Sequence, residues 1–479
     1  MNREFFLNVI FLLSVNLLIK PFYIFGIDRT VQNTVGTDAY GMYFTLFNFT
    51  FLFYIINDFG IQNFNSRNIA QHNHLLDKYV PSILMLKLLL GGVYLLTVFF
   101  FGYLSGYDEH YYHLLFLIAI NQILVALIFY LRSNIAALGK YRIDSLISTM
   151  DKLLMILICS VLLWGNISTE AFQIEWFVYA QIVALSLTAL VAFLVVFKEL
   201  KRFKFRFDLA FLLVILRDSY PYALALFLMT IYNRIDVVMV ERFLPDGLVE
   251  AGIYASAYRL LDACNMLGFL FAGLLLPMFA KMIKNKETIY PLLSFSFLLI
   301  WAIAISVAVA CYFFQGEIMI LLYDEATLYW GSVLAYLMLS FIAVSAIYIL
   351  GSLLTAKGLL MAMNQLFFFG IVINVALNYW LIPDYKALGA AWTTCFTQFF
   401  ILLGYAFLVW KNFELPSMGF GWMRVFSFVI LVVLVNYFVD QNLTMDWRYK
   451  FFLAGGLSFF MAIALKMIDL KALRQLTKT

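Results

Sequence analysis

Hydrophobic runs of about twenty residues recur along the whole chain, separated by short segments that contain Gly, Pro or charged residues. A run of this length, folded as a helix, crosses the roughly 30 Å hydrocarbon layer of a bilayer. The pattern predicts about fourteen membrane-spanning helices. Their expected ranges are 7–27, 40–60, 81–104, 112–131, 145–165 and 172–197, then 219–241, 253–275, 291–314, 331–353, 363–382 and 387–410, and finally 422–439 and 451–466.

Composition supports an all-α integral membrane protein with almost no soluble part. Of the 479 residues, 64% are hydrophobic and 13% are charged, whereas about a quarter of an ordinary soluble domain is charged. The first run is too long for a signal-peptide core and no small-residue cleavage site follows it, so we expect it to be retained. No gap between runs has room for a soluble catalytic or nucleotide-binding domain, and no glycine-rich phosphate loop is present. We expect no nucleic-acid partner.

The distribution of charge predicts sidedness. Most of the 32 Lys and Arg residues fall in alternate loops. The intervening loops hold only Arg29, Arg242, Lys386, Arg448 and Lys450. Because basic residues collect on the cytoplasmic side of membrane proteins, both termini are expected in the cytoplasm.

A short repeat suggests that the helices form two similar halves. Ala39-Tyr40-Gly41-Met42-Tyr43 opens the second run, and Glu250-Ala251-Gly252-Ile253-Tyr254 opens the eighth. We therefore predict a six-helix lobe over 1–205, a second over 206–412, and a C-terminal helix pair with a cytoplasmic tail over 413–479. The basic, aromatic linker 198–206 is expected to anchor on anionic lipid headgroups.

Nine of the charged residues in the predicted spans are the candidate site residues. The basic ones are Lys20, Lys87, Lys152, Arg234 and Arg259, and the acidic ones are Asp58, Asp151, Asp236 and Asp262. An ionised group at mid-membrane costs about 2.5–3.5 kcal/mol, so each should face the protein interior or a water-filled cavity. Residue counting places Lys20 with Arg234 and Arg259 in the outer half, and Lys87 with Lys152 in the inner half.

Two interpretations of these charges remain open. They could be ion pairs that lock neighbouring helices together, and Arg259 with Asp262 shares one helix face. Alternatively, Lys and Arg at two depths could carry a large amphipathic anion across the membrane, because they supply charge-assisted hydrogen bonds to a diphosphate. Under the second interpretation the acidic residues serve ion coupling or structural pairing.

Cysteine and histidine indicate no metal site and no cofactor. Cys159, Cys264, Cys311 and Cys395 each lie alone in an apolar run, which fits small core residues. His72 with His74, and His110 with His113, lie at or near helix ends, where interfacial or loop roles are expected.

The chain resembles the polysaccharide-synthesis transporters of the Wzx or O-antigen flippase type, within the multidrug/oligosaccharidyl-lipid/polysaccharide (MOP) exporter superfamily that includes the MurJ and MATE transporters. In the first half the resemblance is carried by Leu18-Ile19-Lys20-Pro21, the loop Gly36 to Tyr43, and Asp58-Phe59-Gly60 followed by Arg67 and Ala70. The second half adds Arg234-Ile235-Asp236, Gly252-Ile253-Tyr254 with Ala257, and Pro277.

This resemblance implies two six-helix lobes that open alternately to either side of a bacterial inner membrane. The expected substrate is an undecaprenyl-diphosphate-linked oligosaccharide moving outward, with glycan-assembly machinery as a possible partner. By the same resemblance, Lys20, Arg234, Arg259, Lys87 and Lys152 would engage the substrate.

Two other functions are alternatives. An ion-coupled multidrug or cation antiporter of the same superfamily should depend on carboxylates such as Asp58 or Asp236 more than on the basic residues. A lipid-modifying membrane enzyme would need a catalytic constellation, and no His lies mid-span beside an acid.

Overall fold

The computed structural model describes residues 16, 18–62, 65, 69, 75–165, 170–200, 209–413 and 421–468. In that part of the chain every regular element is a helix, and the predicted all-α fold is confirmed. Nine described helices are long and apolar enough to cross a membrane. Large apolar side chains such as Leu96, Trp380 and Phe452 point outward with about three quarters of their surface exposed. Lipid is the solvent that such a surface requires, so this is a multi-pass membrane protein, while the number fourteen stays a prediction.

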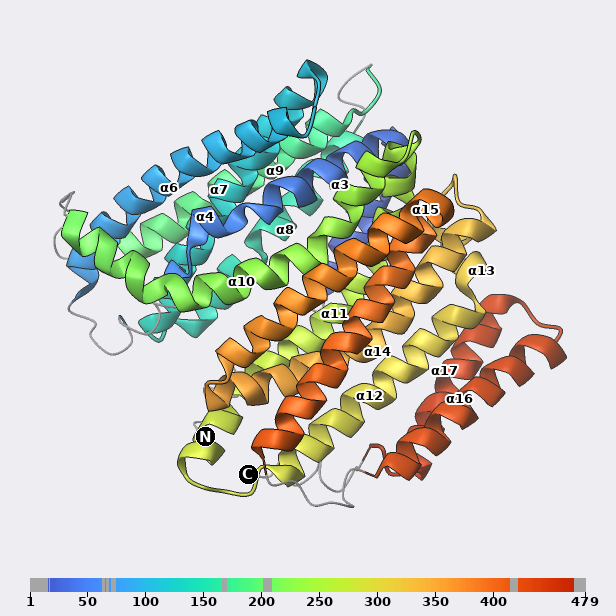
Figure 1. The fold of residues 1–479 in the computed structure, drawn as a ribbon. Coiled ribbons are helices and arrows are strands. Elements are labelled where there is room, and N and C mark those ends of the chain that lie inside the picture. Colours follow the sequence, from blue (N-terminus) through green and yellow to red (C-terminus); the bar gives the residue numbers. More distant parts are fainter. Residues whose placement is uncertain are drawn as a thin grey trace. The chain divides into compact units, whose positions relative to one another are not determined.

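The chain forms two compact units (Figure 1). The first comprises Met1–Arg242 with Asp246–Gly252, and the second comprises Phe243–Pro245 with Ile253–Thr479. These units follow from contacts within the structure, whereas the predicted lobes 1–205 and 206–412 rest on the sequence repeat and remain a prediction.

Unit 1 packs its helices around an aliphatic core. Its elements are η1 (Tyr23–Asp28), α2 (Arg29–Val35), α3 (Thr37–Leu52), α4 (Tyr54–Asp58), α6 (Leu76–Leu104), α7 (Glu109–Ala137), α8 (Tyr141–Trp164), α9 (Ile174–Phe197) and most of α10 (Leu209–Phe243). Buried Val80 and Ile83 of α6, Leu131 of α7 and Val196 of α9 belong to one core cluster.

The first helix extends further than its apolar run. After Pro21 it passes through the π-helical segment η1 and continues as α2 to Val35, where Gly36 ends it with a φ of 86°. Proline lacks the N–H of a regular helical turn, which accounts for the local change in winding. The predicted end at residue 27 was therefore wrong by eight residues, because the last turns of the helix are polar.

Unit 2 contains a folded-back helix pair and a C-terminal pair. Its elements are most of α11 (Gly247–Lys284), α12 (Tyr290–Phe313), α13 (Gln315–Leu322), α14 (Leu328–Lys357), α15 (Leu360–Asn412), α16 (Trp422–Asn442) and α17 (Trp447–Ala464). At Lys386 the backbone of α15 turns through a φ of 54°, so its two arms run antiparallel. Within unit 2, α16 and α17 lie along α12, where Phe428, Val432 and Ala462 complete an apolar cluster (Figure 1).

The N-terminal ends of α3 and α11 cross in direct backbone contact. A Cβ atom on Gly41 would overlap the carbonyl oxygen of Leu248 and lie 2.8 Å from the amide nitrogen of Gly252. Likewise, a Cβ on Gly252 would overlap the carbonyl oxygen of Thr37. The side chain of Gln32 donates a 3.2 Å hydrogen bond to the Gly252 carbonyl at the same place. These two glycines, the centres of the repeated motifs, are required because only a residue without a side chain allows this approach.

Candidate functional site

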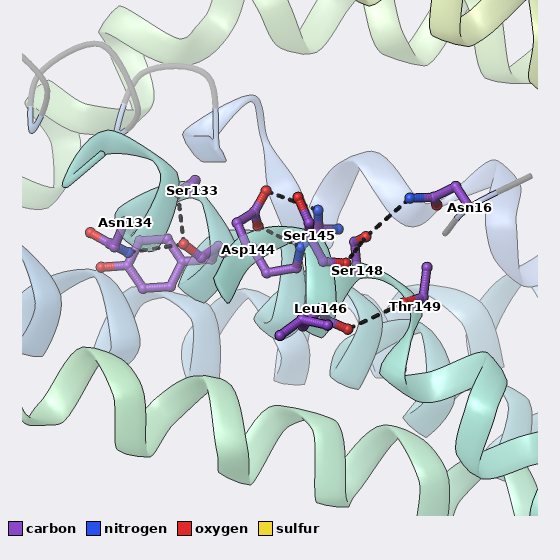
Figure 2. A network of polar contacts seen from close by, with 10 residues as sticks. Asn16, Ser133, Asn134, Asp144, Ser145, Leu146, Ser148 and Thr149 are labelled. Carbon is purple, nitrogen blue, oxygen red and sulfur yellow. Dashed lines mark hydrogen bonds and ion pairs between the residues drawn. The ribbon is translucent and has the colours of Figure 1, made fainter. Parts of the chain in front are cut away.

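A polar stripe on α8 forms the main candidate site in unit 1. Ser145, Ser148 and Lys152 follow one another at three- and four-residue spacing, so they share one face of α8. Asn16 and Tyr23 of the first helix lie along this stripe: Asn16 Nδ2 donates to Ser148 Oγ at 3.4 Å, and the Tyr23 ring faces Lys152. Figure 2 shows Asn16 reaching toward Ser148, with Ser145 and Asp144 further along the same helix.

The stripe brings three cations together. Lys20 interacts electrostatically with Lys152 and Arg132, and with the carboxylate of Asp151. Asp151 Oδ2 lies 3.1 Å from Lys152 Nζ, which also lies 4.8 Å from the centre of the Tyr23 ring. We call Lys20, Arg132, Asp144, Asp151 and Lys152 the Lys20 cluster.

Arg132 and Asp144 neutralise each other within this cluster. Arg132 Nε donates to Asp144 Oδ1 at 2.8 Å, and Nη2 donates to Oδ2 at 3.2 Å. This two-pronged geometry is the strongest form of an Arg–carboxylate pair. In the described part of the chain, by contrast, no hydrogen bond or ion pair is made by the half-buried Lys20 ammonium.

The position of Lys20 corrects the predicted depth layers. We expected Lys20 in the outer half, but it lies in the electrostatic neighbourhood of Lys152, which was assigned to the inner half. The cause is the length of the first helix: its end at Val35 puts Lys20 about 22 Å from the end at 1.5 Å per residue.

Lys87 is paired with Asp58. Lys87 Nζ lies 2.9 Å from Asp58 Oδ1 and donates a second 2.9 Å hydrogen bond to the carbonyl of Asn57. Both charged side chains are nearly inaccessible, at 6% and 5% exposure. The pair joins α6 to the C-terminal end of α4. These contacts explain the two charges as a link between helices, and a substrate contact by Lys87 stays a prediction.

The other candidate residues lie apart from the Lys20 cluster or in the other unit. Arg234 of α10 donates to Asn48 Oδ1 at 3.4 Å, and its guanidinium lies 5.3 Å from the Phe51 ring centre. Asp236 is buried. In unit 2, Arg259 and Asp262 approach to 3.8 Å along one face of α11. Arg234 and its contacts lie in unit 1, and the Arg259–Asp262 pair lies in unit 2. The roles of these residues in transport stay predictions.

Several buried polar residues were missed from the sequence. Asp28, at the end of η1, is 2% exposed and accepts a 2.7 Å hydrogen bond from the Tyr40 hydroxyl. It was assigned to a loop, although Gly36 as a stop signal would have placed it in the helix. Asn374 and Asn378, joined by a 3.1 Å hydrogen bond, are buried on α15 in unit 2. Uncharged polar residues inside apolar runs gave no comparable sequence signal.

The histidines and the basic linker lie only partly within the described residues. Among the described residues, no group of three or more His, Cys, Asp or Glu side chains could hold a metal ion. His113 Nε2 lies 2.9 Å from the Tyr179 hydroxyl, while His72 and His74 lie outside the described residues. Of the linker 198–206, only residues 198–200 are described.

The chain is similar to a family of polysaccharide biosynthesis proteins and to solved structures of membrane transporters. A family model described as polysaccharide biosynthesis protein matches residues 6–283. No curated protein matches the chain. Among solved structures, the lipid II flippase MurJ in an inward closed conformation is similar, with a TM-score of 0.73 at 15% identity over 98% of this chain and 100% of that one.

Two other solved structures share this fold. An inward-facing MATE family multidrug resistance transporter of the MOP superfamily has a TM-score of 0.63 at 14% identity, over 88% of this chain and 98% of that one. A MOP superfamily transporter from Pyrococcus furiosus, described as having a binding pocket of reverse polarity, has a TM-score of 0.53 at 15% identity, over 88% and 96%. At these identities the likeness establishes the fold.

Proposed function

We propose that this chain, which belongs to the polysaccharide biosynthesis protein family, is a flippase for lipid-linked oligosaccharides. The proposed substrate is an undecaprenyl-diphosphate-linked repeat unit of O-antigen, capsule or exopolysaccharide. It moves from the cytoplasmic to the outer leaflet of a bacterial inner membrane by alternating access. Both termini would be cytoplasmic, and glycan-assembly machinery would act before and after the transporter.

The observation that carries this proposal is the Lys20 cluster. Within unit 1, the Lys20 ammonium is in the electrostatic neighbourhood of Lys152, Asp151 and Arg132, where the cations outnumber the anion, and it makes no direct ion pair with a described residue. A cation placed beside other cations inside a membrane protein is costly unless an anion compensates it. A diphosphate supplies that compensation, and its oxygens accept charge-assisted hydrogen bonds from lysine.

The proposal is tested with Lys20→Ala in proteoliposomes that contain a fluorescent lipid-diphosphate oligosaccharide. We expect the flipping rate at low substrate to fall about tenfold or more, because a hydrogen bond to a charged group contributes about 1.5–3 kcal/mol. Lys20→Arg should retain much of the rate. The matched control is Lys140→Ala, which removes a half-exposed lysine that pairs with Glu199 outside the cluster. A folded Lys20→Ala protein that flips at the wild-type rate would refute the proposal.

A second candidate function is an ion-coupled antiporter. Buried carboxylates are its specific support, since Asp28 and Asp236 both lie in unit 1 with 2% exposure, and ionisable groups at membrane depth commonly carry coupling ions. Such a protein should lose cation-driven drug transport with Asp236→Asn while tolerating Lys20→Ala. The lipid-modifying enzyme is the weaker alternative, because the solved structures that share this fold are described as a flippase and a transporter.

A further inference from the structure

The Lys20 cluster combines three basic side chains with two carboxylates. Arg132 and Asp144 satisfy each other through two hydrogen bonds. This leaves Lys20 and Lys152 as two cations and Asp151 as one anion, with all three side chains half-buried. The formal charge that remains on this group is therefore one positive charge.

The ion pair between Asp151 and Lys152 can be replaced by an ion pair between Lys152 and another anion. The two side chains keep 19% and 33% of their surface exposed, and their charged atoms lie 3.1 Å apart. An ion pair whose side chains keep part of their surface open is easier to separate than a fully enclosed one. The Tyr23 ring, 4.8 Å from Lys152 Nζ, offers the ammonium a favourable second contact that does not depend on Asp151. Lys152 can therefore leave Asp151 at low cost when another anion arrives.

The negative charge of the proposed substrate is larger than the positive charge that Lys20, Lys152 and Asp151 carry together. A diphosphate esterified at both ends carries about two negative charges, one on each phosphorus, because each phosphorus keeps a single ionisable oxygen. Lys20 and Lys152 alone would match this charge. With Asp151 present, one of the two lysines is already neutralised, and the carboxylate repels the incoming phosphate.

We propose that Asp151 is the residue that weakens diphosphate binding enough for the substrate to be released. This inference rests on the proposed function. Asp151 acts through Lys152: it competes with the phosphate for the ammonium and takes the ammonium back when the phosphate leaves. A transporter needs this property, since a site that binds its cargo too tightly cannot discharge it.

The test compares Asp151→Asn with the wild-type chain in proteoliposomes, with the apparent KM and the maximal flipping rate measured separately. The substitution removes one negative charge and preserves the size of the side chain. We expect the apparent KM to fall about tenfold and the maximal rate to fall as release slows. A purely structural role would lower the rate or the yield of folded protein without tightening binding. An unchanged or raised KM would refute the inference.

Three further variants complete the design. Asp440→Asn is the matched control, because Asp440 pairs with Lys450 at 4.0 Å in the C-terminal helix pair, and it should leave both parameters unchanged. In the background of Lys152→Gln, Asp151→Asn should tighten binding less than it does in the wild-type chain, since only the repulsion of the phosphate and the electrostatic contact with Lys20 then remain. Asp151→Ser should also lower the KM, and it keeps the inference testable should the asparagine variant fold poorly.

The two proposals fail in different ways. If Lys20→Ala flips normally, the proposed function fails. If Lys20→Ala loses flipping while Asp151→Asn and Asp151→Ser bind the lipid-diphosphate oligosaccharide no more tightly than the wild type, the flippase proposal stands and the role of Asp151 fails.

Discussion

At the residue scale, the sequence identified the charged side chains but not their partners. Lys87 has no acid on its own helix face within one turn, yet Asp58 of α4 meets it at 2.9 Å. A partner 29 residues away is set by tertiary packing, which helix periodicity does not encode. Lys152 is a similar case. Its acidic neighbour Asp151 is adjacent in sequence, but its proximity to Lys20 depends on how the first helix packs along α8.

The Lys87–Asp58 pair gives a stability prediction. Lys87→Ala leaves a buried carboxylate without its cation, so we expect a loss of about 3–5 kcal/mol of unfolding free energy. The double variant Lys87→Met with Asp58→Leu should recover most of this loss, because it removes both buried charges and fills the space with apolar side chains of similar size. Thermal unfolding in detergent measures both, with Lys140→Ala as the exposed control.

A substrate-binding role for Lys87 would give a different result. A Lys87→Ala protein that keeps its stability but loses flipping would assign this lysine to the substrate rather than to the link between α4 and α6.

At the element scale, most predicted spans match helices because apolar runs report burial in lipid directly. The predicted spans 81–104 and 172–197 correspond to α6 and α9, and 363–382 with 387–410 correspond to the two arms of α15. Helix ends were less accurate where the last turns are polar, as between Asp28 and Val35. Apolar runs cannot show such turns, since these residues resemble a loop in composition.

The crossing of α3 and α11 gives a prediction at this scale. In Gly41→Ala the new Cβ overlaps the Leu248 carbonyl, so backbone must move apart. Overpacking of this kind costs about 1–3 kcal/mol, and we expect a lower melting temperature together with faster labelling of a cysteine introduced at Thr37. Gly92→Ala on α6 is the matched control, because no atom lies within 4 Å of its Cβ position.

Unchanged stability and unchanged labelling in Gly41→Ala would show that the two helix ends can separate without cost. Their close approach would then not hold the start of α11 against α3.

At the scale of the whole molecule, the distribution of charge predicts which ends of the helices face the cytoplasm, and the helices alone do not. The turns α6–α7 and α7–α8 lie at opposite ends of α7, and each contains a glycine with positive φ, Gly106 and Gly139, that has open space around it. The second turn is flanked by Arg132, Lys140 and Arg142, whereas the first is flanked by Asp108 and Glu109.

The topology prediction uses these two turns. Alkaline phosphatase, which is active only outside the cytoplasm, should be active when fused after Gly106 and inactive when fused after Gly139. Green fluorescent protein fused at the same positions should give the reverse pattern. Equal activity at both positions, or the reversed order, would contradict the assigned sidedness and the cytoplasmic termini.

The crossing between the repeated motifs also bears on how the chain originated. Gly41 meets Leu248 and Gly252, and Gly252 meets Thr37, so each motif touches its counterpart with equivalent residues. The tyrosines two positions after each glycine are also used alike: Tyr43 accepts a 2.8 Å hydrogen bond from Gln181 of α9, and Tyr254 lies 3.0 Å from Thr394 of α15. Reciprocal contact between equivalent residues is the mark of an isologous interface in a symmetric dimer. A gene duplication that joined two copies of an ancestral dimer-forming protein would preserve this contact, now within one chain.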